Sequence, residues 1–499
     1  MAGPAMTYSM VDYADVQGLV RFGYGRMTSA SYALMRVKNV AAAKAWLRAA
    51  PVTNAVEKKP PPTTALQIAF TAPGLTQLGL PPSVMEGFSR EFRNGMNTDY
   101  RNRLLGDVDF NAPKHWKWGG PESEPHLLVM FFAEPEHFDS FVQNTKGDTW
   151  SDAFEEVICL GTSNLDGDEP FGFADGISQP QIDWDQQRQT PCTQLEYTNI
   201  VALGEFLLGY RNEYGKITDR PLLDPDATNT ELLPAVDAPD KKDLGRNGTY
   251  LVMRQLEQDV GKFWKFLYEH AGGNLAEAGQ LGAKIVGRTQ TGDPLLPVQD
   301  EPIPGTEPRT VKQNQFTYEA DPAGARCPFG AHIRRANPRN SDFPERRIGA
   351  LRKLIIILGF GPKGFYDDLT SSVRFHRILR RGREYGSELS PEQALQPTPP
   401  NEPRGLHFIC LNANISRQFE FLQNAWIANT KFSGLTGESD PLLGNPKPIS
   451  GSSVTGNFTI PSESTLRRRI SGLRQFVTVK GGAYFFLPSL RALRYFAGA

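Results

Sequence analysis

Residues 171–180 read Phe-Gly-Phe-Ala-Asp-Gly-Ile-Ser-Gln-Pro, and the interpretation of the whole chain starts from them. Asp175 stands between Gly172 and Gly176, and glycine permits backbone conformations and close approaches that other residues exclude. Desolvation among the neighbouring phenylalanines would raise the pKa of Asp175 towards a range useful for proton transfer. An ordinary Asp-Gly turn after a strand explains the same residues, so this segment alone leaves both interpretations open.

Two segments downstream extend the pattern. Residues 326–339 read Arg-Cys-Pro-Phe-Gly-Ala-His-Ile-Arg-Arg-Ala-Asn-Pro-Arg, and residues 376–386 read His-Arg-Ile-Leu-Arg-Arg-Gly-Arg-Glu-Tyr-Gly. The three segments, in this order, resemble the distal-acid, proximal-histidine and distal-arginine motifs of the dye-decolorizing peroxidases, a family of haem b enzymes. Residues 14–18 and 65–70 look like the opening strands of that family. The resemblance therefore covers nearly the whole chain.

The mixture of short strands and helices predicts an α+β fold. Strands are expected at residues 32–37, 64–70, 126–133, 204–210, 248–254, 405–412, 476–479 and 483–487, and helices at residues 40–50, 135–144, 259–271 and 416–428. The resemblance implies two ferredoxin-like halves with antiparallel sheets, and haem bound in the C-terminal half. We place the N-terminal half at residues 1–200, ending in the distal Asp motif. The C-terminal half, residues 201–499, carries an insertion near residues 346–373 whose role is open.

The composition excludes several classes of protein. Lys and Arg number 54 against 55 Asp and Glu, a net charge of −1, so the basic excess typical of a nucleic-acid surface is missing. The longest apolar runs, residues 127–132 and 354–358, are too short to span a bilayer. We therefore expect no nucleic-acid or membrane partner, and leave open whether the chain forms a homo-oligomer. The four scattered cysteines favour free thiols over a disulfide framework.

The first residues show no charged segment followed by an apolar core, so no secretory signal is visible. We expect a cytoplasmic protein, or a secreted one if the chain is a trimmed mature form.

Seven histidines are candidates for an iron ligand. His332 follows Gly330 and Ala331, small residues that would allow close packing against a flat macrocycle, and it alone stands in the proximal motif. His376 is the alternative, although packing or binding a propionate suits it better, and His407 lies in a predicted strand. We therefore predict His332 as the ligand of the iron in haem b (iron protoporphyrin IX).

The resemblance implies a distal pair of charged residues. Asp175 matches the acid that carries a proton between the two peroxide oxygens. Arg380 matches the arginine whose fixed charge polarises the O–O bond. Arg381 should face the opposite way, because successive side chains of a strand alternate.

Further residues are expected around the macrocycle. Leu406 and Phe408 match apolar residues that line the distal pocket of the family, and ordinary core packing explains them equally well. Arg339 is a candidate partner of a haem propionate. Asp440 is our candidate for the carboxylate that orients the proximal imidazole, with Glu438 nearly as suitable.

Tyr385 and Trp426 match positions that the family uses as surface radical sites, although most such residues only pack. The chain is thus predicted to be a haem-dependent peroxidase that reduces hydrogen peroxide and oxidises dyes, phenols and other aromatic donors through a ferryl intermediate. A non-catalytic haem-binding or haem-handling protein would need His332 without both Asp175 and Arg380. A scaffold of ferredoxin-like domains would need none of these residues. The physiological reductant is open.

Overall fold

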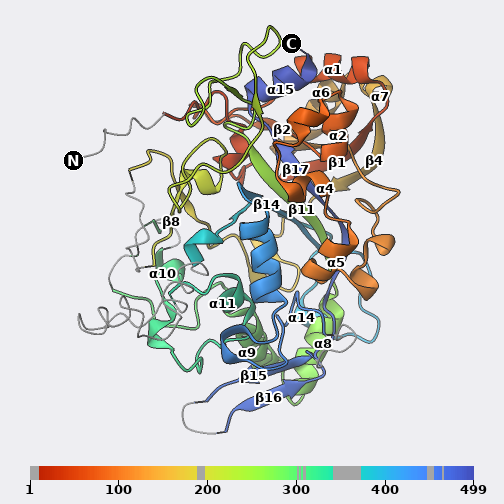
Figure 1. The fold of residues 1–499 in the computed structure, drawn as a ribbon. Coiled ribbons are helices and arrows are strands. Elements are labelled where there is room, and N and C mark those ends of the chain that lie inside the picture. Colours follow the sequence, from red (N-terminus) through yellow and green to blue (C-terminus); the bar gives the residue numbers. More distant parts are fainter. Residues whose placement is uncertain are drawn as a thin grey trace, which may run out of the picture.

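A large antiparallel sheet runs through the molecule (Figure 1). The computed structural model describes residues 10–187, 197–300, 303, 305–306, 311–340, 373–446, 455–462 and 466–498. Within this part of the chain, nine strands pair in the order β12-β14-β11-β17-β2-β3-β1-β4, with β13 beside β14. They are β1 (Ser29–Val37), β2 (Thr64–Phe70), β3 (Leu127–Ala133), β4 (Phe154–Gly161), β11 (Thr249–Gln258), β12 (Leu379–Arg380), β13 (Arg383–Tyr385), β14 (Gly405–Asn412) and β17 (Val477–Leu487). The predicted insertion near residues 346–373 lies outside the described residues except for Val373.

The first four strands form a ferredoxin-like unit with α1 (Val40–Ala49) and α6 (Phe138–Lys146). The chain order is β1-α1-β2-β3-α6-β4, and the strands lie in the order β4-β1-β3-β2 with antiparallel pairing throughout. Asn39 caps α1, because its side chain accepts a hydrogen bond from the backbone N–H of Ala42.

The C-terminal strands repeat the same order. β11 leads into α8 (Val260–His270) and α9 (Leu275–Val286), and β12 with β13 takes the place of a second strand. The spatial order is then β12/β13-β14-β11-β17, again antiparallel. The two units join where Phe486 of β17 pairs with Phe70 of β2. The predicted α+β fold with two ferredoxin-like halves is confirmed, and the halves share one sheet. The boundary at residue 200 stays a prediction.

Shorter elements complete the described part of the chain. The remaining α-helices are α2 (Ala72–Gln77), α3 (Pro82–Met85), α4 (Arg90–Asn94), α5 (Asp99–Leu105), α7 (Trp150–Ala153), α10 (Val311–Asn314), α11 (His332–Ala336), α14 (Pro391–Ala394) and α15 (Leu490–Ala497). The short strands are β5 (Asp168–Glu169), β6 (Phe173–Ala174), β7 (Gln181–Asp183), β8 (Ile200–Ala202), β9 (Leu222–Leu223), β10 (Lys242–Asp243), β15 (Asn457–Ile460) and β16 (Arg468–Ser471). Figure 1 shows α8, α9, α11 and α14 gathered below β14 and β11, and α1, α6, α7 and α15 around the opposite end of the sheet.

The strand predicted at residues 204–210 is wrong. The segment instead forms a short 3-10 helix, η5 (Leu203–Glu205), followed by turns. The chain folds back here, since the N–H of Gly204 donates to the carbonyl of Arg211 at 3.1 Å. A Cβ on Gly204 would lie 2.4 Å from that carbonyl, so glycine is required by the close approach of the backbone.

Two other predictions need correction in detail. The strands predicted at residues 476–479 and 483–487 are one strand, β17, whose register against β11 shifts by a bulge between Val479 and Gly481. The indole of Trp118 packs against Gly481, where a side chain would not fit. The helix predicted at residues 416–428 consists of two π-helical segments, η9 (Ser416–Glu420) and η10 (Leu422–Ile427), as in the 2.9 Å bond from the N–H of Glu420 to the carbonyl of Ile415.

The two faces of the sheet are packed differently in the C-terminal unit. One face carries Leu379, Ile409 and Leu411 into a closed apolar cluster. The other carries Leu406 and Phe408 towards the helices, where a cavity remains. Cys159, Cys327 and Cys410 are free thiols, and Cys192 lies outside the described residues. None of the helices in the described ranges has both the length and the apolar character needed to cross a bilayer.

Candidate active site

A cavity lies between the C-terminal strands and the helices that cover them. Its walls bring together Asp175, His332, Arg380, Leu406 and Phe408, which lie far apart in the sequence. These are the residues predicted for the two sides of the macrocycle and for the apolar lining. The structure therefore places all of them around one space.

Asp175 is positioned by a small hairpin. β5 pairs with β6, and Asp175 follows directly after β6. Gly172 and Gly176 have positive φ values of 84° and 73°, a region that other residues rarely adopt. The N–H of Asp175 donates to the carbonyl of Gly167 at 2.9 Å, and the indole N–H of Trp264 donates to the carbonyl of Phe171 at 3.1 Å. The backbone conformation of this segment therefore favours glycine at positions 172 and 176.

Asp175 and Arg380 form an ion pair in the cavity. Nη1 of Arg380 donates to Oδ1 of Asp175 at 2.7 Å, and the backbone N–H of Arg380 donates to the side chain of Gln179 at 3.0 Å. Burial would raise the pKa of Asp175, but the charge and hydrogen bond of Arg380, together with the N–H of Gly176, hold it below its ordinary value. Asp175 is therefore ionised at neutral pH and able to accept a proton.

Arg381 turns away from this pair, as predicted from strand alternation. Its guanidinium donates to the backbone carbonyls of Leu19 and Val20, at 2.8 and 3.1 Å, on the other side of the sheet. Burial lowers the pKa of Arg381 to about 10. Arg381 therefore anchors the N-terminal segment and takes no part in the cavity.

His332 is the first residue of α11, and its Nδ1 lies 2.9 Å from Oδ2 of Asp440. Oδ1 of Asp440 accepts the backbone N–H groups of Leu442 and Leu443, at 2.9 and 2.8 Å. Asp440 is thus held as a carboxylate, so Nδ1 of His332 carries the proton and Nε2 presents its lone pair. The sequence left Glu438 open as a second candidate for the carboxylate that orients this imidazole. Glu438 instead accepts hydrogen bonds from the backbone N–H and the hydroxyl of Thr459.

The other two candidate histidines are bound elsewhere. His376 lines the cavity, but its ring stacks on Phe421 with centroids 3.6 Å apart, and its Nδ1 bonds the carbonyl of Arg417. His407 lies on the opposite face of the sheet, where Nε2 lies 3.0 Å from the carbonyl of Gly161 and burial lowers the pKa to about 4. Of the three candidates, His332 alone combines a carboxylate partner with a second ring nitrogen that bonds no described residue.

Arg339 lies on the cavity wall with a buried side chain. Its Nη1 donates to the carbonyls of Asn314 and Phe316, both at 2.8 Å, and its guanidinium stacks over the ring of Phe316 at 3.8 Å. Its Nε has no partner among the described residues, and neither has Oδ1 of the nearby cavity residue Asn337. The buried N–H at Nε of Arg339 suits an acceptor oxygen at the edge of a bound macrocycle, whereas Oδ1 of Asn337 requires a donor.

The two predicted radical residues are both buried, with 8 % of Tyr385 and 6 % of Trp426 exposed. Tyr385 stacks on His407 at 4.4 Å, away from the cavity. Trp426 lies edge-on to His376 at 5.3 Å and also contacts Phe421. The aromatic cluster of Trp426 therefore adjoins the cavity wall, whereas Tyr385 does not.

The polar residues of the cavity wall that the sequence interpretation missed include Asp107, Glu169, Arg254 and Gln258. Arg254 and Asp107 form a buried ion pair. A signal for Arg254 was present, because a charge interrupts the apolar run of strand β11. Asp107 lies in the irregular segment after α5 and Glu169 in the two-residue strand β5, and nothing in the residue pattern marks either of them.

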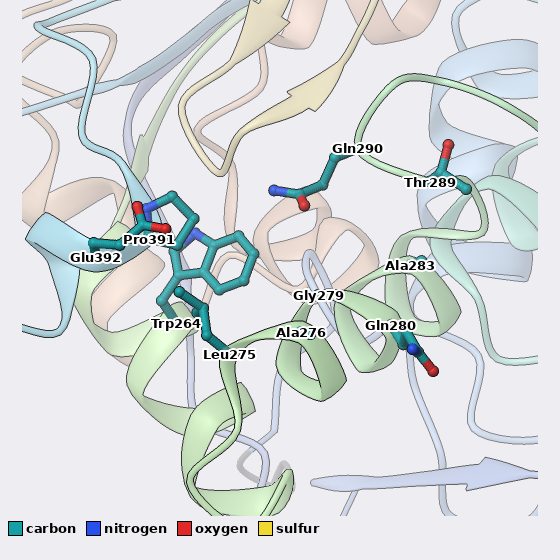
Figure 2. A pocket seen from close by; sticks show the side chains of 10 residues that line it. All are labelled: Trp264, Leu275, Ala276, Gly279, Gln280, Ala283, Thr289, Gln290, Pro391 and Glu392. Carbon is teal, nitrogen blue, oxygen red and sulfur yellow. The ribbon is translucent and has the colours of Figure 1, made fainter.

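A second pocket is bordered by residues of α8, α9 and α14 (Figure 2). Trp264, Leu275, Pro391 and Glu392 surround it, and the amide of Gln290 points into it. Trp264 separates the two spaces, since its ring stacks on Phe173 of the main cavity at 6.4 Å. This pocket holds none of the predicted site residues.

An imidazole–carboxylate pair and an acid–arginine pair on one cavity are the arrangement expected of a haem-dependent peroxidase. The comparisons with known proteins identify which kind. The chain is 28 % identical over 452 residues to dye-decolorizing peroxidase msp1 of Mycetinis scorodonius, covering 87 % of this chain and 76 % of that one. It is 31 % identical over 352 residues to the multifunctional dye peroxidase of an Amycolatopsis species, covering 68 % of this chain and 63 % of that one. No protein-family model matches the chain.

A fungal DyP-type peroxidase from Auricularia auricula-judae aligns with the structure at a TM-score of 0.72 and 27 % identity, covering 99 % of this chain and 100 % of that one. Together with the curated relatives, this likeness shows that the chain belongs to the dye-decolorizing peroxidase family. The protein is an oxidoreductase that acts on peroxide.

Proposed function

We propose that this chain holds haem b in the cavity, with His332 as the iron ligand, and reduces hydrogen peroxide while oxidising dyes, phenols and other aromatic donors. The observation that carries the proposal is that the His332–Asp440 pair and the Asp175–Arg380 pair face one cavity. A protein that only binds or carries haem would need the first pair without the second. The presence of both favours the enzyme.

The proximal pair would fix the ligand. Because Nδ1–H of His332 donates to Asp440, the ring keeps one tautomer and one orientation, and Nε2 becomes a stronger base. Haem, when bound, would supply the iron that exchanges electrons with peroxide. The free Nε of Arg339 would donate to a propionate.

The distal pair would move a proton and stabilise charge. Asp175, ionised through its contact with Arg380, would accept a proton from one peroxide oxygen and deliver it to the other, which leaves as water. Arg380 would stabilise the negative charge that develops as the O–O bond breaks. Leu406 and Phe408 would keep this space narrow and apolar, so that bulky donors react elsewhere.

Electrons from large donors would then pass through aromatic side chains. Trp426 suits this role because its ring adjoins His376, which reaches the cavity wall. Tyr385 is the second candidate.

An absorbance spectrum of the protein reconstituted with haem, before and after addition of peroxide, tests the proposal. We expect a Soret band that shifts on mixing with peroxide and returns as an aromatic donor is consumed. His332→Ala should lose the band, and the matched variant His137→Ala, which alters an exposed histidine of the N-terminal unit that does not line the cavity, should keep it. Wild-type protein without a Soret band would refute the proposal, and a band without peroxide-dependent oxidation would indicate a haem carrier.

A further inference from the structure

Glu169 is a second carboxyl group of the cavity beside Asp175. In the small hairpin, Glu169 pairs with Phe173, and Asp168 pairs with Ala174. Successive side chains of a strand point to opposite sides. Glu169 accordingly lines the cavity, whereas Asp168 is exposed and absent from the lining. The hairpin therefore directs Glu169 and Asp175 into the same space.

The carboxyl group of Glu169 is held in place by two donors. Its Oε2 accepts the backbone N–H of Phe171 at 3.1 Å and the side-chain amide of Gln258 at 2.5 Å. Gln258 is buried at the end of β11 and also lines the cavity. The orientation of Glu169 is thus set by the distal motif on one side and by the sheet on the other.

The two carboxyl groups differ in their tendency to hold a proton. Burial raises the pKa of Glu169 to about 7, against the lowering effect of its hydrogen bonds from Phe171, Gln258 and Phe173, and the charge of Asp175 raises it further. Asp175 is kept ionised by Arg380. Near neutral pH Asp175 is therefore ionised and Glu169 is partly protonated.

Peroxide reduction needs protons inside this cavity. Reducing one hydrogen peroxide to two water molecules consumes two protons and two electrons. If aromatic donors lose their electrons through Trp426 or Tyr385, their own protons are released outside the cavity. Asp175 carries no proton of its own to give, so a second group must supply the protons that end up in water.

We infer that Glu169 relays protons from solvent to Asp175 and, through Asp175, to the peroxide oxygens that leave as water. This inference rests on the proposed function. Glu169 loses one proton at a time and regains it from solvent, and only O–H bonds form and break at its carboxyl group. Because Glu169 acts on peroxide only through Asp175, it is a positioning residue and not a catalytic one.

Replacement of Glu169 by Gln tests the relay, since the amide oxygen can still accept both hydrogen bonds but cannot pass on a proton. The donor should be tetramethyl-p-phenylenediamine, which gives up an electron without a proton. We expect the wild-type kcat to fall above about pH 7. In Glu169→Gln, kcat below that pH should drop at least about tenfold, the inflection should disappear and the solvent deuterium isotope effect should rise. Glu169→Asp should restore part of the rate.

Asp168→Asn is the matched control, because it removes the adjacent carboxyl group of the same hairpin on its exposed side. Its pH profile should match the wild type. An unchanged profile and isotope effect in Glu169→Gln would overturn the relay, as would an equal effect in Asp168→Asn or a loss of haem from Glu169→Gln. A wild-type protein with no Soret band or no reaction with peroxide would instead refute the proposed function itself.

Discussion

The two charged pairs that face the cavity differ in how tightly the protein encloses them. The side chain of Asp440 is 0 % exposed and bonded on both oxygens, so the proximal carboxylate is locked into the packed interior, whereas 25 % of the His332 side chain stays accessible. On the distal side, 40 % of the Asp175 side chain and 32 % of the Arg380 side chain stay accessible. The proximal carboxylate has one fixed task, whereas the distal one must meet a small molecule and exchange a proton with it.

This difference follows from what each side must do. A ligand histidine gains from a rigid partner, because any rotation of the ring would move Nε2. A proton carrier needs room for its reactant and a pKa that is set by a neighbour rather than by complete enclosure. Substitutions in the distal pair should therefore slow the reaction with peroxide, whereas substitutions in the proximal pair should weaken the binding of haem.

The largest effect is expected from the distal pair. Asp175→Asn keeps the shape but removes the proton acceptor, and Arg380→Leu removes the charge that stabilises cleavage of the O–O bond. Each should slow the reaction with peroxide by about 10²- to 10⁴-fold while haem stays bound. Stopped-flow absorbance with excess peroxide measures the rate. If Asp175→Asn reacts at the wild-type rate, the acid–base role belongs to Arg380 or to water.

The proximal pair should show a smaller effect of a different kind. Asp440→Asn weakens the hydrogen bond to Nδ1 of His332, so the affinity for haem should fall by about 10- to 100-fold and the Soret band should shift. Transfer of haem to apomyoglobin measures the loss. Glu438→Gln is the control, because that carboxylate bonds Thr459 and not His332. Equal haem loss in both variants would show that Asp440 only supports the local fold.

Some residues of the two pairs and of the cavity could be predicted from the sequence, and others could not. Asp175, His332 and Arg380 could be predicted because each stands in a contiguous segment that resembles a motif of the family. Arg254 reaches the cavity through the pairing of distant strands, and the charge that interrupts the apolar run of β11 is its one signal in the sequence. Glu169 lies in the local β5–β6 hairpin, where nothing in the residue pattern marks it. The burial of Tyr385 and Trp426 could not be predicted, since the covering residues come from other parts of the chain.

Secondary structure shows the same limit. Strands β2 and β14 match the predicted residues 64–70 and 405–412, because continuous apolar runs bounded by turn residues mark buried strands. The apolar segment at residues 204–210 has the same appearance, but Gly204 allows the chain to fold back there. The bulge that carries β17 past Gly481 depends on the packing of Trp118, which lies in a distant segment.

The pH dependence of the reaction with peroxide tests whether Arg380 sets the pKa of Asp175 in the distal pair. Because the pKa of Asp175 is held below its ordinary value, its carboxylate form persists as the pH falls and is lost only below about pH 4. The reaction with peroxide should therefore keep its rate down to that range and then decline. In Arg380→Leu, burial acts on Asp175 without its counter-charge, so the midpoint of the residual activity should move above about pH 4. A midpoint that does not move would mean that Arg380 does not set the pKa of Asp175.

The smallest effect is expected from the aromatic residues, and it tests whether the narrow distal side excludes large donors. Trp426 adjoins His376 at the cavity wall, whereas Tyr385 stacks on His407 on the other face of the sheet. Trp426→Phe should therefore lower the turnover of an anthraquinone dye several-fold, and Tyr385→Phe should lower it less. Neither should change the rate of the reaction with peroxide.

Steady-state dye decolorisation beside stopped-flow reaction with peroxide measures both rates. Trp150→Phe is the control, since that indole packs on Trp46 and Phe154 in the N-terminal unit, far from the cavity lining. Normal dye turnover in Trp426→Phe, in Tyr385→Phe and in the double variant would show that dyes reach the edge of the haem directly. The distal side of the cavity would then admit large donors as well as peroxide.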